Sequence, residues 1–582
     1  MASSSLSSRS TLLLASRTAF RLVSSASCAS ASVGKRAFGS SLLHAASYSF
    51  SSFRSFSEMG VGGAVLQSDS EYPLGLTKPA HLSLPQISFS AKEIELREWK
   101  GDILAVGVYE NDVSSGVLEN GRLKELDSYV NGVLSEVTKE EDFSGKTGQA
   151  VFARLPGFGF KRLGLIGLGK KNEVFTKALK GFGEAIAAAA KTAQATHVGV
   201  ILPAAQNFST ALKLDSVSTI AAGALLGIHE DNRFKSEAKL SLLKSLDFLG
   251  LGTGPEFEQR FTYVEQVCSG VFLTRHLVNA PANVLTPSAL ANEASSIAST
   301  YSDVLNAKIL DVEQCKELKM GSYLAVAAAS ANPPKFIHLC YKPPTGDIKT
   351  KLAIVGKGLT FDSGGYNLKT GPGCSIELMK FDMGGSAAAL GAAKAISQIK
   401  PLGVEVHFIV AACENMISGT GMRPGDVITA SNGKTIEVNN TDAEGRLTLA
   451  DALVYACKQG VDKIIDLATL TGACIIALGN EIAGIYTPND DMAEEISKAS
   501  EITGERFWRM PLEESYWEGM KSGIADMVNT GGRQGGSITA ALFLKQFVDD
   551  NVKWLHIDMA GPVWSDKKRC ATGFAVSTLV EW

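Results

Sequence analysis

Short apolar segments alternate with longer helix-like segments along most of this chain, and this alternation is the strongest constraint on its fold. Residues 162–168 and 197–203 have the length and apolar character of strands, and an Ala-rich stretch at 177–195 lies between them. A strand, a helix and a second strand in this order form a crossover unit whose strands are parallel. The sequence therefore predicts an α/β fold built on a mixed, mostly parallel sheet.

The same pattern returns in the second half of the chain. Its predicted strands are 352–356, 404–411, 463–467 and 554–557, and its predicted helices include 386–399 and 447–458. A helix over 256–277 would join the two halves, and 582 residues exceed what one ordinary core holds. We therefore expect two α/β domains, at 85–255 and 279–582, joined by a linker helix over 256–278.

The first 57 residues differ from the rest. They contain no Asp or Glu, but six Lys or Arg and twenty serines. Transit peptides are basic, rich in Ser and poor in acids, whereas a secretory signal needs a continuous apolar block that this segment lacks. We expect residues 1–57 to be a transit peptide that directs the chain to the chloroplast stroma, with the mitochondrion as the alternative.

Residues 58–582 carry an excess of acids, with 50 basic and 60 acidic side chains. Nonspecific nucleic-acid binding needs clustered Lys and Arg, so no nucleic-acid partner is expected. No uncharged apolar stretch is as long as a membrane span, so no membrane partner is expected either. The nine cysteines form no CxxC pair and have no histidine at zinc-finger spacing, which favours mostly buried free thiols.

A glycine cluster at 164–169 invites comparison with dinucleotide-binding loops. Its spacing is not GxGxxG, and Lys170 and Lys171 follow it. We expect these residues to be turn glycines rather than a nucleotide site.

Two acid-bearing segments stand where an α/β fold places its ligands, beyond the carboxyl ends of the strands. The first, KGLTFDSGG, follows the strand predicted to end at 356 and contains Lys357 and Asp362, with Lys369 a few residues on. In the second, MKFDMGG, Asp382 stands between Phe381 and Met383 just before an Ala-rich helix. A buried acid among apolar residues needs a cation partner, although a helix N-cap is the alternative for Asp382.

The third segment, NNTDAEGRL, spans residues 439–447 and has the strongest pattern. In extended backbone, residues two apart point to the same side, so Asp442, Glu444 and Arg446 would address one site. The helix that follows would add partial positive charge for bound anions.

Four converging carboxylates, from Asp362, Asp382, Asp442 and Glu444, would repel one another unless cations were bound. Two divalent ions neutralise them, and oxygen ligands suit Mn²⁺ or Mg²⁺, with Zn²⁺ also possible. No histidine lies in these segments, which argues against a His-rich mononuclear zinc site. Bound dications would hold the Lys357 amine neutral as a ligand and leave Lys369 charged.

These segments resemble the leucyl aminopeptidases, the cytosol aminopeptidase family. NTDAEGRL is that family's signature, and KGLTFDSGG, NAPAN at 279–283, TLTGA at 469–473 and SITAALFLKQF at 537–547 are also similar to its motifs. The resemblance covers the second half of the chain, and GPGC at 371–374 resembles plant members. It implies a metal-dependent aminopeptidase that releases Leu and other apolar N-terminal residues from peptides.

The resemblance also implies a role for each motif residue. Asp362 and Glu444 would bridge the metals, Lys357 and Asp382 would complete one site, and Asp442 the other. Lys369 would polarise the scissile carbonyl, and Arg446 would hold a bicarbonate ion as general base beside a water activated by the two metals. Thr469, Leu470 and Gly472 would bind the substrate. The family further implies a macro-like N-terminal domain and a homohexamer built as a dimer of trimers.

Two alternatives remain at this stage. Carboxylates with two metals also catalyse phosphoryl transfer, so a dinuclear phosphoesterase is one rival. The other is a chaperone-like binding role, alone or beside the peptidase activity. The sequence does not specify the metal or the preferred N-terminal residue.

Overall fold

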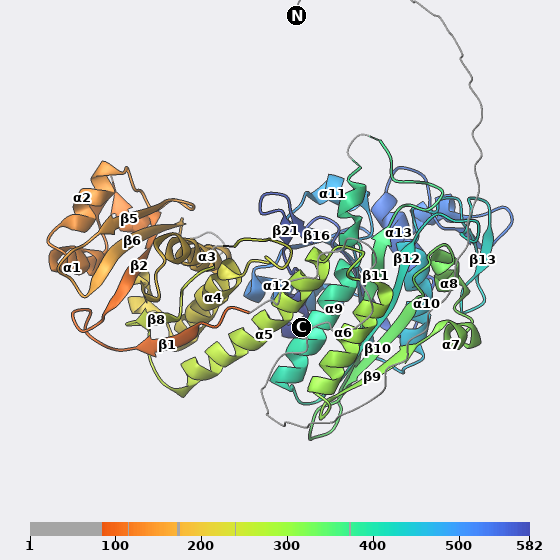
Figure 1. Ribbon diagram of the computed structural model, residues 1–582, viewed down its shortest axis with the longest axis horizontal. Coiled ribbons are helices and arrows are strands. Elements are labelled where there is room, and N and C mark those ends of the chain that lie inside the picture. Colours follow the sequence, from red (N-terminus) through yellow and green to blue (C-terminus); the bar gives the residue numbers. More distant parts are fainter. Residues whose placement is uncertain (1–83, 115, 172–174, 239, 372–373) are drawn as a thin grey trace, which may run out of the picture. The chain divides into compact units, whose positions relative to one another are not determined.

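The computed structural model describes residues 84–114, 116–171, 175–238, 240–371 and 374–582 (Figure 1). The predicted transit peptide, 1–57, lies outside these ranges. Two large sheets organise the described residues, and each carries helices on both faces. The predicted α/β class with mixed, mostly parallel sheets is confirmed.

The first sheet has six strands. Their order is β1 (Ser88–Lys92), β8 (Ser245–Leu249), β7 (His197–Ile201), β2 (Gly101–Tyr109), β6 (Phe160–Gly169) and β5 (Ala150–Arg154). All neighbours are parallel except β5 and β6. A two-stranded ribbon, β3 (Val113–Ser114) and β4 (Val117–Leu118), follows β2.

Alternate residues of β2 pack against different helices, as the pleat of a strand requires. Ile103 and Ala105 belong to the core beneath α3 (Phe175–Ala193) and α4 (Thr210–Ile228). Leu104 and Val106 pack with α1 (Gly121–Tyr129) and α2 (Val133–Glu140). Among the described helices, only α4 is long and apolar enough to cross a membrane, and half of its most apolar window is buried against the rest of the protein.

The second sheet has eight strands. Their order is β17 (Phe507–Arg509), β16 (Ala483–Tyr486), β19 (Lys553–Asp558), β15 (Lys463–Ala468), β11 (Thr350–Asp362), β12 (Val404–Asn415), β10 (Lys335–Tyr341) and β9 (Leu305–Leu310). The four central strands, from β19 to β12, are mutually parallel, and their neighbours on either side are antiparallel to them.

Helices cover both faces of this sheet (Figure 1). On one face lie α9 (Gly384–Ile399) and α6 (Pro287–Thr300), and on the other lie α10 (Gly445–Cys457) and α13 (Gly536–Lys545). The remaining helices and strands are α5 (Pro255–Asn279), α7 (Val312–Glu317), α8 (Gly321–Ala327), α11 (Gly472–Leu478), α12 (Asp490–Thr503), α14 (Val576–Glu581), β13 (Val427–Thr429), β14 (Thr435–Glu437), β18 (Met527–Val528), β20 (Trp564–Ser565) and β21 (Cys570–Ala571).

The glycines of the 164–169 cluster are not turn glycines, and that prediction is wrong. They lie in β6, where neighbouring groups approach the backbone closely. A Cβ atom at Gly164 would lie 2.2 Å from the Phe152 ring, and one at Gly167 would lie 2.1 Å from the carbonyl oxygen of Lys146. Close packing therefore accounts for these two residues.

Candidate metal centre

Strand β11 carries Lys357 and ends at Asp362, so Lys357 lies inside the strand and not in a loop after it. The predicted strand end at 356 is too early, because β11 stays paired with β12 through an irregularity between Leu359 and Phe361. Both Lys357 and Asp362 are buried. The strand thus delivers an amine and a carboxylate to the carboxyl edge of the sheet.

A tight turn follows Asp362. Gly364 and Gly365 have φ angles of 88° and 64°, which side chains other than glycine rarely adopt. A Cβ atom at Gly364 would lie 2.4 Å from the carbonyl oxygen of Asn367 and 2.9 Å from Oδ1 of Asp442. The turn brings Lys369 back over the strand end, where its backbone N–H donates to the carbonyl of Ser363 at 2.9 Å.

Asp382 lies at the end of a short 3₁₀ helix, Ile376–Phe381, just before α9. The residue at the N-cap of α9 is Met383, so the alternative prediction of an N-cap aspartate is wrong. Asp382 Oδ1 accepts hydrogen bonds from Lys357 Nζ and from Thr469 Oγ1, each at 2.8 Å. Its carboxylate therefore points into the site.

The NNTDAEGRL segment is not extended throughout, and the prediction from two-residue alternation is wrong in this respect. Glu444 has helical angles (φ −75°, ψ −35°), and Arg446 is already the second residue of α10. Asp442 and Glu444 nevertheless both face the lysines: Asp442 Oδ1 lies 2.5 Å from Lys369 Nζ, and Glu444 Oε1 lies 2.9 Å from Lys357 Nζ. The NH1 group of Arg446 donates to the carbonyl of Asn529 at 2.8 Å.

The structure brings these side chains into one cluster. Carboxylate oxygens of Asp362, Asp382 and Glu444 all lie within 4.8 Å of one another. Lys357 contacts Asp382 and Glu444, and Lys369 contacts Asp362, at 2.8 Å, and Asp442. Four carboxylates thus meet two amines in a largely buried space.

The electrostatics of the cluster follow from this crowding. Burial and the neighbouring Glu444 carboxylate raise the pKa of Asp362 to about 6, and burial raises the pKa of Asp382 well above its usual range. Burial alone would lower the pKa of Lys357, but the carboxylates of Asp382 and Glu444 outweigh it and raise that pKa. Burial lowers the pKa of Arg446 to about 10, so the guanidinium stays charged at neutral pH.

The donor set fits divalent ions. Within the described residues, Glu444 Oε2 is buried without a hydrogen-bond partner, whereas Asp382 Oδ2 and Asp442 Oδ1 are contacted by the amines of Lys357 and Lys369. Buried oxygens of this kind are costly unless a cation or a donor satisfies them. Four carboxylates also exceed the charge of two amines by two, which further favours bound cations.

The predicted substrate-binding residues border the same cluster. The Thr469 hydroxyl donates to Asp382, and its carbonyl accepts from Lys357 Nζ at 3.2 Å. The N–H of Leu470 donates to Asp558 Oδ1 at 3.2 Å. Gly472 begins α11, and a Cβ atom placed on it would meet no atom within 4 Å. The space beside Gly472 is therefore open.

Three supporting residues escaped the sequence analysis. Asn415, the last residue of β12, donates from Nδ2 to Asp362 Oδ1 at 2.9 Å and to the carbonyl of Thr441 at 3.0 Å, so it ties two acid-bearing segments together. Asn529 binds the segment before α10, and Asp558 binds the 470–471 backbone. Asn415 and Asp558 are the last residues of strands β12 and β19. A polar residue at the carboxyl end of a strand is the sequence feature that could have identified them.

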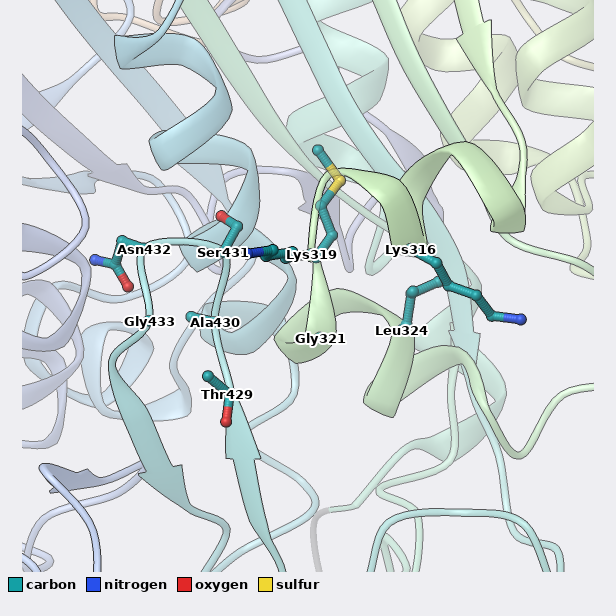
Figure 2. A pocket seen from close by; sticks show the side chains of 10 residues that line it. Lys316, Lys319, Gly321, Leu324, Thr429, Ala430, Ser431, Asn432 and Gly433 are labelled. Atoms are coloured by element: carbon teal, nitrogen blue, oxygen red, sulfur yellow. The ribbon is translucent and has the colours of Figure 1, made fainter.

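A separate hollow of about 610 Å³ lies between α8 and the turn after β13 (Figure 2). The amine of Lys319 points toward Ser431 there, whereas that of Lys316 points away. No carboxylate lines this hollow, so its chemistry does not suit a metal ion.

Sequence comparison matches residues 272–580 to the catalytic domain of the cytosol aminopeptidase family and residues 105–238 to the N-terminal domain of the same family. The chain belongs to the cytosol aminopeptidase family. Its enzymes are metal-dependent aminopeptidases, and this chain is one of them, as the sequence predicted.

Relatives within the family are close. Leucine aminopeptidase 2, chloroplastic, from Oryza sativa subsp. japonica is 70% identical over 88% of this chain and 86% of its own length. The protein of the same name from Arabidopsis thaliana is 68% identical over 89% of each chain. A solved structure of a mutant tomato leucine aminopeptidase is 61% identical, covers 88% of this chain and 98% of its own, and superposes with a TM-score of 0.83. The names of the plant relatives support the predicted chloroplast location.

Proposed function

We propose that the cluster of Asp362, Asp382, Asp442, Glu444 and Lys357 binds two divalent ions and that the enzyme releases leucine and other apolar residues from the N-termini of peptides. The observation that carries the proposal is the convergence of four largely buried carboxylates at one sheet edge, where the buried Glu444 Oε2 has no hydrogen-bond partner. When bound, Mn²⁺, Zn²⁺ or Mg²⁺ would acidify a water molecule and polarise the peptide carbonyl.

The chain's own residues would divide the remaining work. Asp362 and Glu444 are proposed to bridge the ions, Lys357 and Asp382 to complete one ion's ligands, and Asp442 the other's. Lys357 is fully enclosed, whereas the Lys369 side chain is 15% exposed and borders the space beside the cluster. We therefore propose that Lys369 holds the scissile carbonyl oxygen as negative charge develops on it.

Arg446 is proposed to hold bicarbonate as the general base. It lies in the first turn of α10, where the helix dipole and the guanidinium both favour an anion. Its charge is constant across the working pH range, so it orients the base and does not itself accept a proton.

The substrate is proposed to lie against Thr469, Leu470 and Gly472. Backbone groups of this segment would bind the peptide main chain, and Asp558 fixes the segment by accepting from Leu470 N, Thr471 N and the Thr471 hydroxyl. The free α-amino group of the substrate would face the metal centre, which restricts cleavage to the first peptide bond.

We also propose the domain boundaries, the cellular location and the oligomeric state. The transit peptide would occupy residues 1–57, a macro-like domain 85–255, the linker helix 256–278 and the catalytic domain 279–582. The mature enzyme would assemble in the chloroplast stroma as a homohexamer, a dimer of trimers.

Two lysine variants test the proposed roles. Lys357→Ala removes a metal ligand, so bound metal and activity toward leucine arylamide should fall together. Lys369→Ala should lower turnover about a hundredfold or more while metal content stays near that of the wild type. Equal metal loss in both variants would contradict the separate roles, and chelator-sensitive cleavage of a phosphodiester in place of the arylamide would favour the phosphoesterase.

A further inference from the structure

A second group of metal-ligand side chains lies on β10 and β12. Cys340 on β10 is directly opposite His407 on β12, and Glu405 precedes His407 by two residues on the same strand. Residues paired across strands, or two apart along one strand, point to the same face of a sheet. The sulfur of Cys340, a carboxylate oxygen of Glu405 and a ring nitrogen of His407 lie within 4.8 Å of one another.

This group is far from the carboxylate cluster. Glu405 is the second residue of β12, whereas Asn415, which contacts Asp362, is the last. At about 3.3 Å per residue, the intervening strand separates the two places by roughly 30 Å. The Cys340 group therefore lies at the opposite end of the parallel strands and is not part of the aminopeptidase centre.

A hydrogen-bond chain orients His407. Its Nδ1 lies 2.8 Å from His338 Nε2, and His338 Nδ1 lies 3.1 Å from the Tyr455 hydroxyl. His407 Nε2–H donates to Glu405 Oε1 at 2.9 Å in the ion-free structure. With an ion bound, the ring would carry its proton on Nδ1 and donate to His338, His338 would donate in turn to Tyr455, and Nε2 and Glu405 would both be free to face the ion. Metal-binding histidines are commonly fixed in this way through their second nitrogen.

The local charge balance leaves room for a cation. The buried Glu405 carboxylate lies 3.6 Å from the amine of Lys342, whose side chain is 62% exposed. Lys351 and Lys308 are the other nearby cations. An exposed lysine is easily displaced from such a contact by a bound ion.

We propose that Cys340, Glu405 and His407 bind a divalent ion separate from the catalytic metals, and that the ion is Zn²⁺. A thiolate, an imidazole and a carboxylate are the three ligand types that zinc accepts, and thiolate disfavours Mg²⁺ and Mn²⁺. A hollow of about 610 Å³ is lined in part by Cys340 and His338, so water as a fourth ligand would approach from the side of Cys340. Binding would release the thiol proton of Cys340 and would tie β10 to β12.

Cobalt substitution of the full chain tests this site directly. Co²⁺ bound to a thiolate shows a sulfur-to-metal charge-transfer band in the near ultraviolet, and no cysteine belongs to the carboxylate cluster. The metal-stripped wild type should develop this band in full by the third equivalent of Co²⁺, when the carboxylate cluster is also filled, and Cys340→Ser should abolish it. Cys374→Ser, which changes an exposed cysteine, is the matched control and should keep the band.

Zinc content supplies a second readout that does not depend on the catalytic stoichiometry. The wild type should bind one more equivalent of Zn²⁺ than Cys340→Ser or Glu405→Gln, while leucine arylamide hydrolysis by these variants stays within about twofold of the wild type. A thiolate band that survives Cys340→Ser, or equal zinc content in all three proteins, would overturn the proposal.

Discussion

Lys357 is a buried amine whose position depends on the absence of a side chain at Gly445. A Cβ atom on Gly445 would lie 2.4 Å from Lys357 Cε and 2.6 Å from its Nζ. Such distances are well inside van der Waals contact, so any larger residue must displace the amine from Asp382 and Glu444. The glycine of the NTDAEGRL motif is therefore needed to leave room for the Lys357 side chain, and it also begins α10.

Gly445→Ala should therefore lower aminopeptidase activity at least tenfold and lower bound metal. Gly121→Ala is the matched control, because Gly121 is likewise the first residue of a helix and a Cβ there meets nothing within 4 Å. The control should match the wild type in both measurements. Full activity in Gly445→Ala would refute the proposed position of Lys357 as a ligand.

A buried carboxyl outside the metal centre should give the fold a pH dependence. Asp451 accepts from the backbone N–H groups of Tyr323 and Ser431, at 2.8 and 2.7 Å, and burial raises its pKa from 3.8 to about 6. Between these values the unfolded chain loses the proton while the folded chain keeps it. The contribution of Asp451 to stability is therefore present below about pH 4, falls as the pH rises to about 6, and is constant above.

Denaturant unfolding of the wild type and of Asp451→Asn from about pH 4 to pH 7 measures this effect. The difference in unfolding free energy between them should change by about 3 kcal/mol in favour of the variant across that range, most of it below pH 6. A difference that does not vary with pH would show that Asp451 is ionised in the folded protein throughout.

At the scale of elements, the sequence predicted types and order better than ends. The apolar cores of β11, β12 and β15 were recognisable, but β11 runs six residues beyond its predicted end because backbone pairing with β12 continues through polar residues. The start of α10 was placed at 447 and lies at Gly445, since the turn conformation of Glu444 comes from tertiary contacts. Hydrophobic pattern marks what is buried, and these ends are set by hydrogen bonds between distant segments.

The close packing of α5 against α9 depends on a glycine in α9. Helices α5 and α9 meet where a Cβ on Gly391 would lie 2.2 Å from the Thr274 hydroxyl and 2.6 Å from the carbonyl of Gly270. Glycine normally weakens a helix by about 1 kcal/mol relative to alanine, so its presence in the middle of α9 reflects this contact. The contact fixes α9, and the segment leading into α9 carries Asp382.

Gly391→Ala should destabilise the protein by about 2 kcal/mol despite the better helix propensity of alanine, because overpacking forces the helices apart. Thermal unfolding of the metal-loaded enzyme measures it. Gly181→Ala in the middle of α3 is the control: a Cβ there meets no atom within 4 Å, so the change should be neutral or stabilising by up to about 1 kcal/mol. Equal effects of the two substitutions would contradict the packing argument.

At the scale of the whole molecule, the acid-bearing segments lie far apart in the sequence and meet only because the parallel strands end at one sheet edge. The sequence predicted this convergence in two ways. The strand order places the three segments at one sheet edge, and the carboxylates of Asp362, Asp382 and Glu444 need cations to offset their charge. The supporting contacts of Asn415, Asn529 and Asp558 were not predicted, because a lone Asn or Asp at a strand end has no pattern that marks its distant partners. The Cys340 group was also missed, because Cys340 lies 65 or more positions from Glu405 and His407 and meets them only through strand pairing.

The central claim is that bound divalent ions and a free substrate amine are both needed for cleavage. The most direct measurement strips the full enzyme of metal and restores Mn²⁺ or Zn²⁺ in steps, with leucine arylamide and its N-acetylated form assayed side by side in bicarbonate buffer. Activity toward the free amine should be absent after stripping and should return in proportion to metal bound, while the acetylated substrate stays uncleaved. Cleavage that survives complete stripping, or equal rates on the two substrates, would contradict the account.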